Sequence, residues 1–397
     1  MTPLSAIAKI AQALKRPSSP PARSSLRLED TFRFREPLED AGGFVAKAYE
    51  SSSKLLVARR VKEGSVVAAF GLDSTTRRVE TASADVIAGS VASYCPRKGL
   101  SYEWPSLAAP PPPLPPHPVF LLLPNGEVPE PEDPAISTLN PAGERYDSDY
   151  SADLAEDEMR SSLESWMLRS LPLPGCAVLL DGPIYPLPTA FVSEGAPLRI
   201  RRTLLALLRR RLEALSSLES QGVPVIGVVK RVERSSILRN TRGMEKWVGE
   251  KEGDASALER AFLSSERGAG RVYVTPKILI SPPSLADLQL PPKLVQYVVV
   301  PAGKYQGDLP FARVYRLEFT PSTLKLLEEM RSDPLSVMIG DSLLLGGQEP
   351  VSIRASDRRA SEIAEALKRA LAASLVGEGA LLSYWSWREA QWREGTS

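Results

Sequence analysis

Two aspartates lie at the ends of apolar runs, where a charged side chain needs a partner or access to water. The stretch VVAAFGLDSTTR, residues 66–77, passes from small and β-branched residues to Asp73 and three hydroxyl residues, and GCAVLLDGPI, residues 175–184, ends similarly on Asp181. Each apolar run is predicted to be a buried strand. Because an unpaired buried carboxylate costs several kcal/mol, we expect each aspartate either to cap a turn in water or to hold a cation.

Two further acids complete a candidate cluster. Glu164 lies on a predicted helix just before the Asp181 strand, and Asp357 lies at the start of the last predicted helix. If both strands are central in one sheet, the carboxylates emerge close together and repel unless a divalent cation lies between them. The alternatives are a turn role for Asp73 and Asp181, a solvated helix face for Glu164 and a helix-dipole role for Asp357.

The residue types at these positions suit phosphodiester hydrolysis. Carboxylate oxygens are preferred ligands of hard cations such as Mg²⁺ and Mn²⁺. Two such cations about 3.5–4 Å apart can activate a water molecule and stabilise the leaving oxygen. The one histidine, His117, lies in the proline-rich stretch PPPPLPPHP, where we expect a solvated spacer. Any metal ligands are therefore predicted to be oxygen atoms.

Composition narrows the class of protein without naming it. The chain has 397 residues, 43% of them hydrophobic, and carries 49 Lys and Arg against 48 Asp and Glu. Two cysteines in no paired motif argue against a disulfide framework and a zinc site, and the absence of a long apolar run makes a soluble, cytoplasmic protein the default expectation.

Basic clusters occur at 59–62 and 199–211; the second lines a DNA path if its helix faces the cleft, and otherwise forms a solvated helix face.

The order of predicted elements indicates the fold. Strands at 65–72, 77–82 and 84–94 are joined by short polar turns, which favours an antiparallel meander. Helices at 153–171 and 197–222 then alternate with the strands at 176–181 and 223–230, which favours parallel crossovers. We therefore predict an α/β protein with an RNase H-like mixed sheet flanked by helices.

The chain is expected to divide into a helical N-terminal region, one interrupted nuclease domain and insertions. The predicted parts are a helical region at 1–60, nuclease-domain segments at 61–104, 150–240 and 293–382, a Pro-rich loop at 105–149, a helical insertion at 241–292 and a Trp-rich tail at 383–397.

Four stretches resemble the NurA nucleases of archaea, which work beside the hexameric translocase HerA. The stretches are FGLDSTTR, VLLDGPIYPL, VPVIGVVKRVERSSIL and EPVSIRASDRRASEIAEALKRAL, in that order between about residues 66 and 375. The resemblance implies an RNase H-like fold, a homodimer, and Mn²⁺-dependent (or Mg²⁺-dependent) cleavage of DNA as a 5′-to-3′ exonuclease and single-strand endonuclease in end resection of double-strand breaks. It also implies HerA-type ATPase and DNA ends as partners, and no membrane association.

The resemblance assigns roles by position. Asp73 and Asp181 match metal-binding aspartates, Glu164 matches a helical glutamate, and Asp357 falls at the metal-binding position of the terminal helix. Lys230 matches a lysine at the end of the following strand, where it can neutralise a phosphate as a point charge. Arg77, which closes the first stretch, is assigned with Lys230 to DNA binding.

The chain departs from the family pattern at two places. Some members carry a Tyr eight residues before a His at the terminal helix, where this chain has Glu349 and Asp357, and the usual Asp-Gly-Ser of the first motif is Asp-Ser-Thr here. These departures leave two rivals open. One is a non-catalytic NurA-like subunit that binds DNA or regulates the translocase, and the other is a different RNase H-like nuclease of the resolvase or transposase type.

Overall fold

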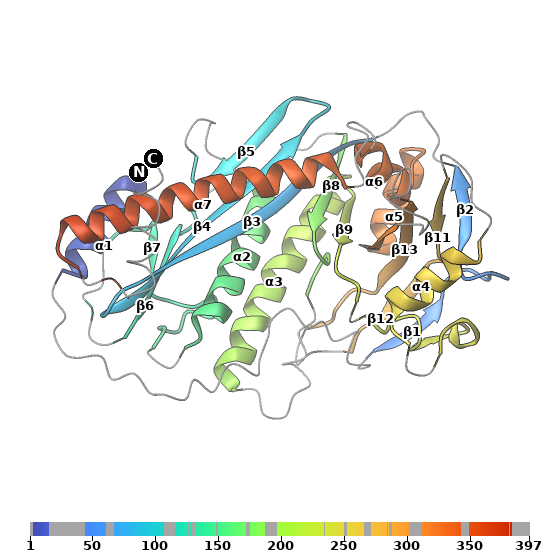
Figure 1. The fold of residues 1–397 in the computed structure, drawn as a ribbon, viewed down its shortest axis with the longest axis horizontal. Helices are drawn as coiled ribbons and strands as arrows, with labels where there is room; N and C mark the ends of the chain where they lie inside the picture. Colours follow the sequence, from blue (N-terminus) through green and yellow to red (C-terminus); the bar gives the residue numbers. More distant parts are fainter. Residues whose placement is uncertain are drawn as a thin grey trace.

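The chain folds around one large mixed sheet (Figure 1). The structure is a computed structural model, and the part of the chain that it describes is residues 3–15, 44–60, 67–106, 116–125, 128, 132–147, 150–171, 175–186, 197–233, 235–249, 252–265, 271–283, 285, 288–301, 312–342, 349–380 and 382. The predicted Trp-rich tail at 383–397 lies outside these residues, as does part of the predicted Pro-rich loop.

Fourteen strands are found within the described ranges, and all of them belong to that sheet. Their bounds are β1 Val45–Ala48, β2 Val57–Arg60, β3 Ala68–Glu80, β4 Ala84–Cys95, β5 Leu100–Trp104, β6 Phe120–Pro124, β7 Ile136–Ser137, β8 Cys176–Asp181, β9 Val225–Val229, β10 Thr241–Arg242, β11 Arg271–Val274, β12 Ile278–Ser281, β13 Lys293–Pro301 and β14 Ala312–Phe319. The strand order is β10-β1-β12-β13-β14-β9-β8-β3-β4-β6-β7, with β5 beside β4, β11 beside β13 and β2 beside β11.

The centre of the sheet has the predicted topology. Strands β3, β4 and β5 are antiparallel neighbours, while β8 is parallel to β3 and β9 is parallel to β8. The two parallel connections each contain a helix, as expected for crossovers within one sheet. A mixed α/β fold is therefore confirmed, and the order of these five strands is compatible with an RNase H-like arrangement.

The prediction that a strand ends at Asp73 is wrong. The predicted strands at 65–72 and 77–82 are one strand, β3, which pairs with β4 from Gly71 through Glu80. The hydroxyl residues after Asp73 suggested a turn, but threonine also favours strands. Their side chains find partners on helices instead of in water: Thr75 contacts Ser361, and Thr76 donates to Glu156.

The helices in the described ranges cover both faces of the sheet. They are α1 Pro3–Ala13, α2 Ala152–Ser170, α3 Leu198–Ser220, α4 Asp254–Leu263, α5 Pro321–Glu329, α6 Pro334–Ser342 and α7 Val351–Gly377, with one 3₁₀ turn at Glu245–Trp247. None of these helices is long and apolar enough to cross a membrane.

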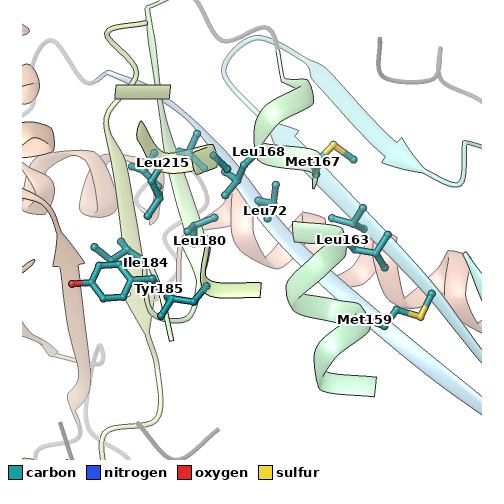
Figure 2. Packing of buried hydrophobic residues seen from close by; sticks show 14 of the residues in the cluster. Leu72, Met159, Leu163, Met167, Leu168, Leu180, Ile184, Tyr185 and Leu215 are labelled. Carbon is teal, nitrogen blue, oxygen red and sulfur yellow. The ribbon is translucent and has the colours of Figure 1, made fainter. Parts of the chain in front are cut away.

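Alternating residues of the central strands separate two cores. Ile87 packs with α2 and α3, whereas its neighbours Val86 and Ala88 pack with α1 and α7. The first core brings Leu72 of β3 and Leu180 of β8 against Met159 and Leu163 of α2 (Figure 2). The central strands thus run between α2 and α3 on one face and α7 on the other (Figure 1).

Three other sequence predictions need correction. In the predicted helical region 1–60, residues 44–60 contain β1 and β2, and α1 is the helix found among the residues described there. The predicted helical insertion contains α4 but also β10, β11 and β12. The predicted Pro-rich loop contributes β6 and β7 to the sheet. Short strands paired only at a sheet margin carry little periodic signal, which explains these errors.

Candidate metal and phosphodiester site

Asp73 and Asp181 lie side by side on neighbouring strands. The parallel pairing of β3 with β8 runs in register up to Leu72 opposite Leu180, and each aspartate is the next residue. Neighbouring strands are about 4.8 Å apart. Because β8 ends at Asp181 while β3 continues, the two carboxylates occupy the place where the sheet loses one strand.

Glu164 and Asp357 reach this place from opposite faces of the sheet. Ser74 of β3 donates a 2.7 Å hydrogen bond to Glu164 Oε1 on α2, and Asp357 lies on α7. Burial raises the pKa of Asp73 well above its usual range, and the charges of Asp181, Glu164 and Asp357 raise it further. The structure therefore brings the four predicted carboxylates into one electrostatic cluster.

The first turns of α7 are fixed closely on β3 by the absence of a side chain at Gly71. A Cβ atom at Gly71 would lie 2.1 Å from the backbone carbon of Ser352. Ser356 donates a 2.9 Å hydrogen bond to the Gly71 carbonyl, and Asp341 accepts bonds of 2.8 Å from both the N–H and the hydroxyl of Ser352. The helix begins at Val351, so Asp357 lies in its second turn instead of opening it.

Three basic side chains enter the cluster. Lys230 Nζ lies 2.9 Å from Asp181 Oδ2 and 2.9 Å from Glu349 Oε1. Arg211 of α3 lies 2.6 Å from Glu164 Oε2, and Arg160 of α2 lies 3.8 Å from Asp73 Oδ1. Lys230 therefore lies at the end of the strand after Asp181, as predicted from the sequence, and its contacts are two carboxylates.

The carboxylates at this site outnumber the cations. Glu349 and the four clustered acids make five potential negative charges, against four cations: the three named above and Arg313, which lies 4.0 Å from Glu349. The pKa of Asp181 is raised because burial outweighs the opposing effect of Lys230. Burial opposes the charge on Lys230, yet Asp181 and Glu349 raise the pKa of this lysine above its ordinary value. An added cation would relieve the remaining excess of negative charge.

The donor chemistry of this site fits a hard divalent cation. Every clustered acid offers carboxylate oxygens, which Mg²⁺ and Mn²⁺ prefer. As they stand, no three His, Cys, Asp or Glu side chains among the described residues are grouped so as to hold a metal ion. Lys230 and Arg211 engage Asp181 and Glu164 in ion pairs, which a bound cation would have to displace.

Sequence reasoning placed Arg211 in a basic cluster but missed its contact with Glu164, the contact of Arg160 with Asp73 and the contact of Glu349 with Lys230. Arg211 had a detectable signal, because it falls within the apolar stripe of α3 that includes Leu204, Leu208 and Leu215. A charged residue at such a position needs a buried partner. Arg211 is indeed buried.

Other predicted sites have different surroundings. Arg77, assigned to DNA binding, lies on β3 four residues beyond Asp73 and pairs with Glu365 of α7 at 3.3 Å. Its contact with DNA therefore stays a prediction. On α3, Arg199 pairs with Asp147 and Arg202 pairs with Glu144, so these two arginines pair with acids of the segment before α2.

His117 is not the solvated spacer that we expected. Its Nε2 atom lies 2.8 Å from the Ser162 hydroxyl, and its ring packs near Trp166. Burial lowers the pKa of His117 to about 4. The side chain therefore joins the Pro-rich segment to α2 as a neutral imidazole at neutral pH.

Comparison with known proteins gives a family. The NurA domain matches residues 67–362, a range that contains all four clustered carboxylates. No curated protein matches the sequence. The NurA nuclease from Sulfolobus solfataricus is similar in structure, with 14% identity and a TM-score of 0.45 over 87% of this chain and 92% of that one.

Two other similar structures are NurA with manganese and NurA bound to dAMP and manganese. The first has 10% identity and a TM-score of 0.43, covering 81% of this chain and 92% of the other. The second has 10% identity and a TM-score of 0.37, covering 76% of this chain and 86% of the other.

Proposed function

Because the chain belongs to the NurA family, we propose that it is a divalent-metal-dependent deoxyribonuclease that hydrolyses phosphodiester bonds at the cluster around Asp73. The supporting observation is the register of β3 and β8, which sets Asp73 beside Asp181 at the point where β8 ends. Glu164 and Asp357 add to the charge at that point. Four acids delivered by four elements can supply oxygen ligands for hydrolysis assisted by divalent cations once the ion pairs of Lys230 and Arg211 open.

Each residue of the chain has a distinct task in this proposal. Asp73, Glu164, Asp181 and Asp357 would hold the cation, and Mn²⁺, present in two of the similar structures, is the first ion to test. When bound, such a cation lowers the pKa of a water molecule and stabilises charge on phosphate oxygens. The Asp73 carboxylate is oriented by the backbone N–H of Ser74, which donates to Oδ1 at 2.8 Å.

The cations of the chain position the other groups. Arg211 holds Glu164 through a buried 2.6 Å contact, which limits the rotamers of that carboxylate. Lys230 is partly exposed and shared between two acids, so a phosphate can replace one of its carboxylate partners. In that position it neutralises phosphate charge as a point charge. With a cation and a substrate bound, these acids and Lys230 would exchange their ion pairs for contacts with the cation and the phosphate.

The test is digestion of 5′-labelled single-stranded DNA with Mn²⁺, with Mg²⁺ and with EDTA. Cleavage in Mn²⁺ that EDTA abolishes is expected for the natural sequence. The Asp73→Asn variant should be inactive, while the matched exposed variant Asp153→Asn should retain activity. Absence of cleavage with every divalent cation would contradict the proposal.

A second candidate is a non-catalytic subunit that binds DNA or regulates a translocase. The observation that favours it is the salt bridge from Lys230 to Glu349, because the family position that carries Tyr in some members here holds a lysine-bound acid. DNA binding without cleavage in any metal would select this candidate. Preference for branched DNA or strand joining would instead select a resolvase-like or transposase-like enzyme.

The family resemblance extends the proposal to finer activities. We propose 5′-to-3′ exonuclease and single-strand endonuclease action in end resection of double-strand breaks, by a homodimer that works with a HerA-type hexameric ATPase. Substrates labelled at each end report polarity, and circular single-stranded DNA reports endonuclease action. Co-elution of the chain with a HerA-type ATPase in size-exclusion chromatography tests the partnership.

A further inference from the structure

Arg160 reaches the carboxylate cluster from the same stripe of α2 as Glu164. Met159 and Leu163, one turn apart on this helix, pack into the core between α2 and the sheet (Figure 2). Arg160 and Glu164 each follow one of these two residues, so they lie one above the other along the margin of the apolar stripe. Because Glu164 belongs to the cluster, the period of the helix sets Arg160 beside it.

Arg160 occupies the edge of β3 at the place where β8 stops. Within the described ranges, β8 pairs with β3 up to Leu72, two residues before Ser74. Backbone groups beyond that point need other partners. The Ser74 N–H donates to Asp73 Oδ1 at 2.8 Å, and the Ser74 carbonyl accepts from Arg160 Nε at 3.0 Å. The guanidinium group therefore lies at the end of the lost strand, next to Asp73.

Ser74 fixes this guanidinium together with two of the acids. Its hydroxyl donates to Glu164 Oε1 at 2.7 Å. One residue thus orients Asp73 through its N–H, Glu164 through its hydroxyl and Arg160 through its carbonyl. Moving Arg160 away would leave the Ser74 carbonyl without this partner, which opposes the movement. The guanidinium is therefore held in place before any ligand binds.

Most donor groups of Arg160 have no acceptor in the part of the chain that the structure describes. A guanidinium carries several N–H donors in a planar fork, and the hydrogen bond that this side chain makes uses Nε. Its Nη2 atom lies 3.8 Å from Asp73 Oδ1, an ion pair beyond hydrogen-bonding distance. The side chain is 28% exposed, so a ligand from solvent can reach the remaining donors.

Two other cations of this cluster, Arg211 and Lys230, are engaged more fully. Arg211 is buried and donates to Glu164 Oε2 at 2.6 Å and to Ser165 Oγ at 2.9 Å. Lys230 lies 2.9 Å from each of two acids, and its ammonium group is a point charge without a fork. Arg160 is therefore better suited than either to contact two oxygens of one phosphate.

We propose that Arg160 is a catalytic residue whose guanidinium donates two hydrogen bonds to the non-bridging oxygens of the phosphate at the Asp73 cluster. In hydrolysis a water oxygen bonds to phosphorus, the P–O bond to the leaving oxygen breaks, and the water supplies the proton that the leaving oxygen takes up. Negative charge is spread over the non-bridging oxygens during this exchange. A guanidinium already fixed in place stabilises that charge without reorganising. The inference deepens the proposed function and rests on it.

The rival role for Arg160 is structural, as a counter-charge that keeps Asp73 ionised and in place. Loss of such a counter-charge would weaken the binding of Mn²⁺ by Asp73. Loss of a phosphate donor would leave Mn²⁺ binding unchanged or make it tighter, because a nearby positive charge opposes the binding of a cation. Lysine separates the roles again, since it keeps the charge but lacks the fork.

The experiment makes three measurements on the natural chain, Arg160→Gln and Arg160→Lys. Electron paramagnetic resonance of unbound Mn²⁺ gives the metal affinity. Isothermal titration calorimetry gives the affinity for thymidine 5′-monophosphate in the presence of Mn²⁺. Cleavage of a labelled single strand gives kcat and KM. The matched control is Arg169→Gln, at an exposed position in the last turn of the same helix.

We expect both Arg160 variants to bind Mn²⁺ at least as tightly as the natural chain. Arg160→Gln should bind thymidine 5′-monophosphate about tenfold to a hundredfold more weakly, as loss of a charged hydrogen bond implies. It should also lower kcat by about 100-fold to 1000-fold. Arg160→Lys should restore only a small part of either loss, and Arg169→Gln should match the natural chain.

Three results would overturn the assignment of Arg160. Weaker Mn²⁺ binding in Arg160→Gln would show a counter-charge role. Natural nucleotide binding and cleavage in Arg160→Lys would show that charge alone matters, and the same result in Arg160→Gln would show that Arg160 does not contact phosphate. Circular dichroism melting checks the fold of each protein, and Arg160→Lys serves if Arg160→Gln does not fold.

Failure of this inference can be told apart from failure of the proposed function. Mn²⁺-dependent cleavage by the natural chain, with no change in Arg160→Gln, rejects only the role of Arg160. No cleavage by the natural chain rejects the proposed function. The calorimetric titration then still tests the contact between Arg160 and phosphate, and equal nucleotide affinity of the natural chain and Arg160→Gln would reject that contact too.

Discussion

Two clusters of buried charge lie on the same sheet, and their charges are balanced differently. At the carboxylate cluster, Asp73 is buried beside three other acids and its pKa is raised. At the junction of β13 and β14, Glu318 is equally buried but lies 2.9 Å from Lys293 Nζ and 2.9 Å from Arg316 Nη2. Burial opposes the Glu318 charge, yet these two cations lower its pKa below the usual range.

The second cluster is completed by neighbouring polar groups. Arg316 donates to Ser235 at 3.2 Å, and Ser235 donates to Asp254 at 2.6 Å. Lys293 and Arg316 together match Glu318 and Asp254 in charge, so the net charge of this cluster is zero. We expect it to hold β13, β14 and α4 together without any added ion.

The difference indicates which cluster is built for chemistry. A buried carboxylate that the chain neutralises itself gains a lowered pKa and rigidity. A buried carboxylate surrounded by other acids gains a raised pKa, an arrangement that structure alone does not favour. The opposite directions of the two pKa shifts therefore mark the Asp73 cluster as the place where a cation from solution is expected.

The largest expected effect is on catalysis. Asp73→Asn should reduce Mn²⁺-dependent cleavage by on the order of 1000-fold, because it removes a metal ligand. The free energy of unfolding without metal should not fall, since the variant removes a buried charge repelled by three neighbours and keeps an oxygen for the Ser74 N–H. Gel-based cleavage rates and urea denaturation measure the two effects. A large loss of stability in Asp73→Asn without metal would show that Asp73, like Glu318, is a structural charge.

Glu318→Gln should lower the free energy of unfolding, unlike Asp73→Asn, whose main effect is on catalysis. It leaves Lys293 and Arg316 buried without their acid, which we expect to lower the free energy of unfolding by about 3–5 kcal/mol. The matched variant Glu362→Gln, on the exposed side of α7, should change it by less than about 0.5 kcal/mol. Urea denaturation compares them, and equal stability of the two variants would show that Glu318 is not a structural charge.

Gly71→Ala tests how the position of Asp357 depends on close packing. The added methyl group would meet the backbone of Ser352 at 2.1 Å, so α7 must shift. We expect a cost of about 1–3 kcal/mol in unfolding free energy and a loss of cleavage larger than this stability loss explains. Thermal melting and cleavage at a temperature where the variant is folded separate the two. Full activity would show that Asp357 need not be held closely.

The smallest expected effect is on the pH dependence of stability without metal. The folded-state pKa of Asp73 is raised. Its favourable contribution to the free energy of unfolding is therefore present below the ordinary pKa of 3.8 and is lost as pH rises through the folded pKa. The folded-state pKa of Glu318 is lowered, so its contribution is present above 4.5 and is lost as pH falls through the folded pKa. Denaturation curves from pH 3 to 8 should show Asp73→Asn removing only the first dependence.

Much of the central fold could be predicted from sequence, because local patterns determine it. The apolar run before Asp181, the amphipathic stripes of α2 and α3, and their alternation gave the parallel strands β8 and β9. The continuous pairing of β3 was not predictable in this way. The polar run Ser74 to Thr76 becomes a strand because β4 pairs with it and the helices α2 and α7 provide partners for its hydroxyl groups.

The carboxylates of the site could be predicted, whereas their partners could not. Asp73 and Asp181 stand out because charge follows an apolar run. The contacts of Glu164 with Arg211 and of Lys230 with Glu349 join residues 47 and 119 positions apart in the chain, as their numbers show, and depend on how helices pack. No local pattern records such contacts, apart from the charge of Arg211 within an apolar stripe.

The central claim is that the acids around Asp73 and Asp181 bind a divalent cation. The most direct measurement is a crystal structure of the natural chain with Mn²⁺, with the metal located by its anomalous scattering. The claim predicts an anomalous peak in contact with Asp73 and Asp181, with Lys230 moved away from Asp181 and the peak lost in Asp73→Asn. An ordered cluster that keeps the Lys230 to Asp181 ion pair and shows no peak at saturating Mn²⁺ would contradict it.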